Sequence, residues 1–71
     1  MRNETVKNIR DYLGMSQKEF AKWLGVSRSV IGMIETNQRN VSPRVQNKIA
    51  RRFRITNDFL AFVENKKRLS S

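Results

Sequence analysis

SQKEFAKWLGVSRSVIGMIETNQR, residues 16–39, is the stretch that decides the fold of this chain. It divides into two short segments whose apolar residues recur at helical spacing. Phe20 and Leu24 lie four positions apart in the first segment, and Ile31 and Ile34 lie three apart in the second. Residues at these spacings share one face of an α-helix. The stretch therefore predicts two short amphipathic helices in immediate succession.

Signals for helix starts and ends agree with this division. Ser16 followed by Glu19 is a capping box, in which each side chain satisfies a backbone amide of the other residue. Gly25 stops the first helix, and Ser27 caps the second. Helix, tight turn and helix together form the outline of a helix-turn-helix motif, which places its second helix in the major groove of DNA.

Three further helices complete the predicted fold. Ser42 followed by Pro43 is a helix start, because Pro is favoured at the first helical position. Apolar residues recur at helical spacing as Val6, Ile9 and Leu13, as Val45, Ile49 and Phe53, and in a short last helix from Asp58 to about Glu64. No segment alternates with period two. We therefore expect an all-α, five-helix domain over residues 1–65, followed by a basic tail at residues 66–71.

The net charge is strongly positive for so small a chain. Fifteen Lys and Arg residues face six Asp and Glu residues, a formal charge of +9 over 71 residues. The alternative to a binding role is a well-solvated surface. Solvation needs less charge than this, and self-repulsion costs stability. We therefore expect a polyanionic partner, either nucleic acid or an acidic protein surface.

The composition disfavours several classes of function. The chain has no Cys and no His, which argues against disulfides, the usual zinc sites and the common nucleophile–base pairs. No apolar run is long enough for a signal peptide or a membrane span, and no helix keeps a wide apolar face for a membrane surface. We expect a cytoplasmic protein that has no cofactor or metal and is not an enzyme.

The residue spacing resembles that of the lambda-repressor-like family of helix-turn-helix proteins, the Cro/CI-type or XRE-like regulators of phages and bacteria. The resemblance covers about residues 4–64. The matching positions are Gln17, Ala21, Gly25, Val26, Ile31, Ile34 and Glu35, a basic loop that ends at Arg39, and the closing Ile55, Asp58, Phe59 and Leu60. The resemblance implies the five-helix fold of that family, with the helix-turn-helix at the second and third helices, and binding to double-stranded operator DNA.

The resemblance also implies roles for individual residues. Base-contacting positions of the family are occupied by Arg28, Ser29, Gly32 and Met33. Phosphate-contacting positions are occupied by Gln17, Lys18, Ser27, Asn37, Gln38, Arg39, Asn40 and Arg44, the loop residues through backbone amides as well as side chains. Arg10 and Glu35 match a pair that forms a partly buried salt bridge between the first and third helices of phage repressors. An arginine at the start of a recognition helix can bond guanine O6 and N7 bidentately. The alternative for Arg28 is a solvated side chain.

Departures from the pattern keep a protein-binding role open. The outward side of the recognition helix carries Val30, Gly32 and Met33 where polar side chains are usual, and Trp23 adjoins the inward face of the preceding helix. Exposed Trp and Met residues are typical of protein-binding hot spots. For Trp23 the alternative is packing across the first helix or over a Lys stem. The surplus apolar residue Phe62 suggests a dimer interface. Trp23, Val30, Met33 and Phe62 are the candidate protein-interface residues.

Two functions from different classes follow. The first is a sequence-specific transcription regulator of Cro or short-repressor type, which binds a palindromic DNA operator as a homodimer. The second is a phage modulator or antirepressor that uses the same fold to bind a partner repressor protein. Replacement of Met33 by Gln separates them, because an apolar protein interface would suffer strongly and DNA binding little.

Overall fold

The computed structural model describes residues 1–70, which form five helices and no strand. The helices are α1 (Asn3–Tyr12), α2 (Gln17–Leu24), α3 (Arg28–Glu35), α4 (Pro43–Arg52) and α5 (Asn57–Ser70). The predicted all-α, five-helix architecture is confirmed. The helix-turn-helix is the α2–α3 pair, which makes the most extensive helix–helix contact of the fold.

Local hydrogen bonds explain where the helices of the motif begin and end. The hydroxyl groups of Ser16, Ser27 and Ser42 each accept a hydrogen bond from the amide three residues later, at 3.1, 3.3 and 3.2 Å. The Ser16–Glu19 capping box is complete. Gly25 ends α2 in the left-handed conformation, with φ of 75°, which an L side chain rarely adopts. These features agree with the expected boundaries.

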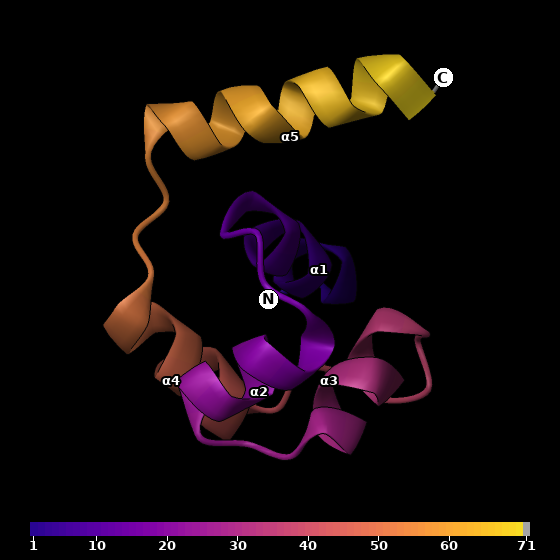
Figure 1. The fold of residues 1–71 in the computed structure, drawn as a ribbon, viewed down its shortest axis with the longest axis vertical. Helices are drawn as coiled ribbons and strands as arrows, with labels where there is room; N and C mark the ends of the chain where they lie inside the picture. The colour runs from indigo at the N-terminus through magenta and orange to yellow at the C-terminus, as the bar shows by residue number, and fades with distance from the viewer. Residues whose placement is uncertain (71) are drawn as a thin grey trace.

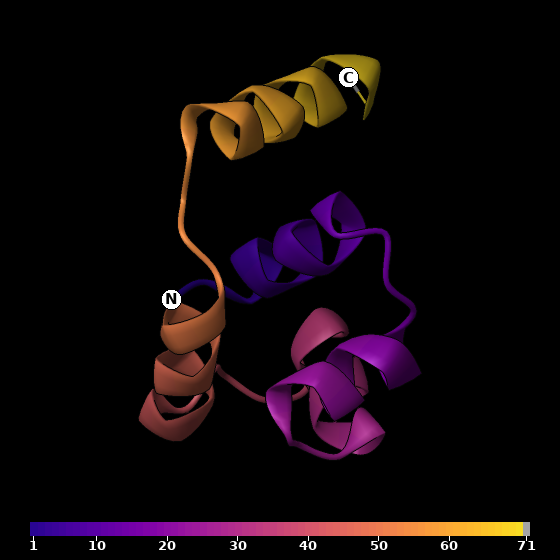
Figure 2. The same ribbon diagram turned by 60° about the vertical axis from the view of Figure 1, so that its left-hand side comes forward.

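Every helix contributes to one hydrophobic core. Its buried members are Val6, Ile9, Phe20, Ala21, Leu24, Ile31, Ile34, Val45, Ile49 and Phe59. In Figure 1, α1 lies between α5 and the α2–α3 pair, and α4 stands at the side of α2. Figure 2 shows the same order, with an extended linker that carries the chain from α4 up to α5. The motif is therefore held from behind by α1 and from the side by α4.

The last helix is longer than expected. The predicted end near Glu64 is wrong, because α5 continues to Ser70 and includes most of the segment expected as a tail. Residue 71, the end of that expected tail, lies outside the described residues. The ammonium group of Lys66 donates to Asn8 Oδ1 at 3.1 Å and also pairs with the Asp11 carboxylate, so the added turns are anchored on α1.

A cluster of aromatic rings joins α5 to the rest of the fold. The Tyr12 ring makes edge contacts with Phe53, Phe59 and Phe62, at centroid distances of 6.0, 5.4 and 5.3 Å. Phe53 and Phe59 also meet edge-on at 5.0 Å. Such edge-to-face contacts contribute beyond the area that they bury. Phe62 is thus a half-buried member of this cluster as well as a candidate interface residue.

Candidate nucleic-acid interface

The recognition helix α3 has one face in the core and one face toward solvent. Ile31 and Ile34 are completely buried. On the other side, Arg28 and Ser29 are exposed at the first turn, and Met33 is half-buried one turn further on. Because core contacts fix the helix and leave these side chains outside, α3 can present a guanidinium and a hydroxyl to a ligand.

Gly32 lies on the same side of α3, and packing within the protein does not require a glycine there. A Cβ atom at this position would meet only the side-chain oxygen of Gln17, at 3.6 Å, an ordinary van der Waals distance. Glycine within a helix costs about 0.5–1 kcal/mol relative to alanine. The glycine therefore has no structural explanation inside the fold, whereas close approach of an external backbone would explain it.

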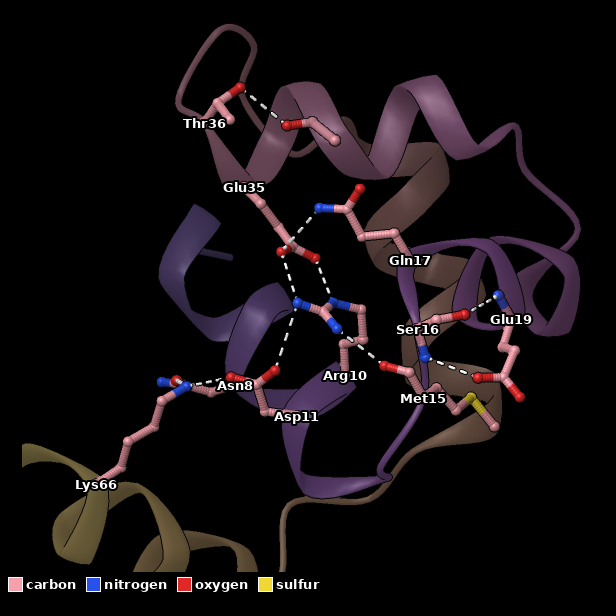
Figure 3. Close-up of polar contacts among 11 residues, drawn as sticks. Asn8, Arg10, Asp11, Met15, Ser16, Gln17, Glu19, Glu35, Thr36 and Lys66 are labelled. Carbon is pink, nitrogen blue, oxygen red and sulfur yellow. Dashed lines mark hydrogen bonds and ion pairs between the residues drawn. The ribbon is translucent and has the colours of Figure 1, made fainter.

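A buried ion pair fixes α3 to α1. Arg10 Nε donates to Glu35 Oε2 at 2.6 Å and Arg10 Nη2 donates to Glu35 Oε1 at 2.9 Å, as Figure 3 shows. The side chains are 16% and 5% exposed. The hydrogen bonds to Glu35 raise the pKa of the Arg10 guanidinium above its ordinary value, against the opposing effect of partial burial. Arg10 Nη1 also donates to the Met15 carbonyl at 2.9 Å, which ties the α1–α2 turn to the pair.

Gln17 is tied to this ion pair. Its side-chain amide donates to Glu35 Oε1 at 3.3 Å, and its side chain is half-buried between the start of α2 and α3. The side chain assigned to a phosphate contact thus already has a partner in the protein. A contact from this position to a phosphate is best made by the backbone amides at the start of α2, which have no partner within the helix.

The loop after α3 is folded against the end of that helix. Asn37 takes the left-handed conformation, with φ of 60°. Its amide donates to the Ile34 carbonyl at 3.1 Å, and the amides of Gln38 and Arg39 donate to the Met33 carbonyl at 2.8 and 3.4 Å. These three amides satisfy the end of α3, so the expected phosphate contacts through them are disfavoured. Side chains remain as the contact groups of the loop.

Asn3 is a residue of this region that the sequence pattern did not predict. Its side-chain amide donates both to Asn37 Oδ1, at 3.1 Å, and to the Arg39 carbonyl, at 2.9 Å. It thereby attaches the loop to the start of α1. No sequence signal could have revealed this contact, because 34 and 36 residues separate the partners and Asn is common at helix starts.

The structure places the other expected phosphate contacts on the surface around α3. The exposed members of that set are Lys18, Ser27, Asn37, Gln38, Arg39, Asn40 and Arg44. Arg39 and Arg44 flank a shallow hollow at the start of α3, whose floor is formed by Val26, Val30 and Val45. Two guanidinium groups thus stand beside the N-terminal turn of the recognition helix.

Most of the candidate protein-interface residues are engaged within the fold. The Trp23 ring stacks on Phe20 at 5.8 Å, and the guanidinium carbon of Arg52 lies 5.4 Å from the Trp23 ring centroid. Arg52 of α4 therefore covers the tryptophan ring. Val30 packs against the core, as Phe62 does against Tyr12. Among the candidate protein-interface residues, Met33 has the fewest such contacts within the fold.

Two other kinds of site are not found in the described part of the chain. Within residues 1–70, no group of three or more acidic side chains is placed to hold a metal ion. None of the helices in that range is both long enough and apolar enough to cross a membrane. The surface around α3 is thus the main candidate site of the described structure.

Comparison with known proteins identifies the family. The sequence model of a helix-turn-helix family matches residues 6–68, nearly the whole chain. Comparison with curated proteins and with solved structures gives no significant match. The matched family is the XRE or lambda-repressor-like type and consists of DNA-binding regulators. The residue spacing, the five-helix fold and this match agree, and the chain belongs to the lambda-repressor-like family of helix-turn-helix proteins.

Proposed function

We propose that this protein is a sequence-specific transcription regulator of Cro or short-repressor type, which reads the major groove of an operator with α3. It acts among the DNA of the bacterial cytoplasm and needs no cofactor. Regulation follows from its own concentration or from a partner. The observation that carries the proposal is the outward side of α3, where exposed Arg28 and Ser29 are followed by a glycine that packing does not require.

Each outward residue of α3 has a role that its chemistry allows. Arg28 bonds guanine O6 and N7, and Ser29 donates to or accepts from a neighbouring base edge. Gly32 lets the helix backbone approach the groove, and Met33 packs against a thymine methyl group. These four positions lie on two successive turns, the length of helix that a major groove admits.

Phosphate contacts position the helix in the groove. The exposed cations Lys18, Arg39 and Arg44 surround α3 and suit the two DNA strands that border the groove. Asn3 supports this arrangement because it holds the backbone at Arg39 in place. The side chains of Ser27, Asn37, Gln38 and Asn40 supply weaker polar contacts of the same kind.

Homodimer formation on a palindromic operator is part of the proposal. Ile55 and Leu60, before and within α5, are 60% and 54% exposed and form no part of the core. Exposed apolar side chains of this size favour contact with a second copy. Replacement of Leu60 by Glu should abolish cooperative binding to a two-half-site duplex and leave half-site binding intact, as measured by fluorescence anisotropy.

The experiment that tests the proposal is selection of bound duplexes from a random DNA pool at about physiological salt. We expect enrichment of a palindromic site, and loss of that enrichment for Arg28→Ala/Ser29→Ala. The variant should keep salt-dependent, sequence-independent binding, because its phosphate contacts are unchanged. If the wild-type protein enriches no site, α3 is not a reader of base sequence.

A phage modulator or antirepressor that binds a repressor protein is the second candidate. Met33 favours it, because a half-buried methionine lies in the middle of the face that would meet the partner. Trp23 and Val30 contact other residues inside the fold, so the apolar surface that remains for a protein partner is small. Met33→Gln should weaken binding to a co-encoded repressor at least tenfold and change DNA binding little. The reverse pattern would contradict this candidate.

A further inference from the structure

The segment from residue 36 to residue 57 contains no acidic residue. It carries six cations, which are Arg39, Arg44, Lys48, Arg51, Arg52 and Arg54. None of the six takes part in an ion pair within residues 1–70. Most of the net charge of the protein is therefore unneutralised and concentrated on α4 and the segments beside it.

Three of these cations form a row along α4. Arg44, Lys48 and Arg51 are spaced at i, i+4 and i+7, which places them on one face of the helix. At 1.5 Å per residue the row is about 10 Å long. It begins at Arg44, which borders the hollow at the start of α3. It then passes the α2–α3 turn, where the Lys48 ammonium lies 3.6 Å from the position that a Cβ atom on Gly25 would take.

The row ends in a second hollow, away from the recognition helix. Lys48, Arg51 and Arg52 line this hollow together with Leu24 at the end of α2. Arg52 is oriented by its position over the Trp23 ring. The row is thus continuous with the proposed DNA-binding surface at one end and extends beyond it at the other.

Helix stability does not account for the row. Arg51 favours α4 because it lies in the last turn, near the negative end of the helix dipole. Arg44, in the first turn, has the opposite effect, and like charges at i and i+4 repel each other. An external polyanion removes both penalties. The length of the row, about 10 Å, corresponds to roughly three successive phosphates along one DNA strand.

We propose that the α4 row, Lys48 and Arg51 in continuation of Arg44, binds the phosphate backbone of the duplex that flanks the segment read by α3. The partner is DNA because the row starts at the DNA-binding surface and is uninterrupted by any acid. The inference rests on the proposed function for the position of the duplex, but the contact itself is independent of base sequence. It adds two phosphates to the footprint of each protomer.

Salt dependence tests the proposal. Lys48→Gln/Arg51→Gln removes the two new contacts and keeps Arg52 on Trp23. The matched control is Lys7→Gln/Lys67→Gln, which loses the same charge from the hollow between α1 and α5. Binding is measured by anisotropy on a long random duplex and on the selected operator. We expect the slope of log K against log salt to be shallower by about 1.8 in the row variant. A rise from about 50 to 200 mM salt then weakens DNA binding by the variant about twelvefold less than DNA binding by the wild type. The control should keep the wild-type slope.

Trp23 provides a second measurement. It is the only tryptophan of the chain, and the Arg52 guanidinium that lies over it belongs to the same hollow as the row. A duplex on the row should change the Trp23 emission. A shortened duplex that covers only the α3 contacts should leave that emission as it is in the free protein. Lys48→Arg/Arg51→Lys, which keeps both charges, should restore the salt slope and the emission change.

The outcomes separate this inference from the proposed function. An unchanged slope and emission in the row variant, with operator selection intact, would overturn the α4 contact alone. Loss of operator selection in the wild type, with the slope difference kept on random duplex, would overturn sequence reading alone. If polyglutamate binds the row more tightly than random duplex of equal charge does, the row serves an acidic protein and the assignment to DNA fails. Circular dichroism and thermal melts of all variants verify that they fold.

Discussion

Arg10 and Glu35 show how two charges hold the recognition helix. The Glu35 side chain is 5% exposed, and its partners are Arg10 and Gln17. Arg10→Met leaves this buried carboxylate without its cation, so we expect a loss of about 3–5 kcal/mol in unfolding free energy. Urea denaturation measures it. Arg10→Met/Glu35→Leu should recover much of the loss, and a single variant as stable as wild type would contradict the buried pair.

Gly32 separates stability from function at a single position. A Cβ here would make only an ordinary van der Waals contact with the Gln17 side chain, at 3.6 Å, and the backbone is helical, so Gly32→Ala should raise the unfolding free energy by about 0.5–1 kcal/mol. Gly32 belongs to the proposed DNA-contacting side of α3, and we expect the added methyl group to weaken operator binding about tenfold, or roughly 1.4 kcal/mol. A thermal melt and a binding titration on the same sample measure both effects. A stabilised variant that binds operator as well as wild type would show that no partner approaches here.

Among the elements, α2 has a start that depends on pH. The backbone amide of Ser16 donates to the Glu19 carboxylate at 2.9 Å, and this hydrogen bond lowers the pKa of Glu19. A lowered pKa in the folded state means that the ionised carboxylate stabilises the protein above its unfolded pKa of about 4.3. That contribution is lost as the pH falls through the folded pKa. Glu19→Gln should therefore lose less stability than wild type between roughly pH 6 and pH 3. Parallel pH profiles from urea denaturation would refute this.

The elements also show which features the sequence could predict. The starts of α2, α3 and α4 were predictable because a serine cap acts on an amide only three residues away. The end of α5 was not, because its last turns are anchored by Lys66 on Asp11, a contact across 55 residues. The same reason hid the contacts of Asn3 with the loop, whose partners lie 34 and 36 residues away. Contacts between neighbouring residues can be predicted from a sequence, whereas contacts between distant residues become visible only in the folded structure.

At the scale of the whole molecule, α5 is joined to the body by the aromatic cluster and by Lys66. The Lys66 ammonium and its Asp11 partner are 36% and 28% exposed, so solvent weakens their pairing. We expect Lys66→Met to lower the unfolding free energy by about 1 kcal/mol. Lys67→Met, a neighbouring change on an exposed side chain, should be neutral within error. Equal melting temperatures for both variants would mean that the aromatic cluster alone holds α5.

The polar contacts of Figure 3 connect most of the molecule to the recognition helix. Lys66 of α5 contacts Asp11 of α1, Asp11 lies 3.4 Å from Arg10, and Arg10 pairs with Glu35 of α3. The family was predictable from the pattern of residues 16–39, because that pattern is local, and the candidate site around α3 stays a prediction from the same residues. The row along α4 emerged only when the fold placed the α4 cations beside the helix-turn-helix.

The division of α3 into two faces has an evolutionary consequence. Ile31, Ile34 and Glu35 hold the helix, whereas Arg28 and Ser29 make no core contact. Substitutions on the outer face can therefore accumulate without loss of folding, and under the proposed function a lineage can acquire a new operator while it keeps the same scaffold. Such a scaffold suits a regulator whose target sites diverge quickly, because each substitution changes recognition and leaves the stability of the fold unchanged.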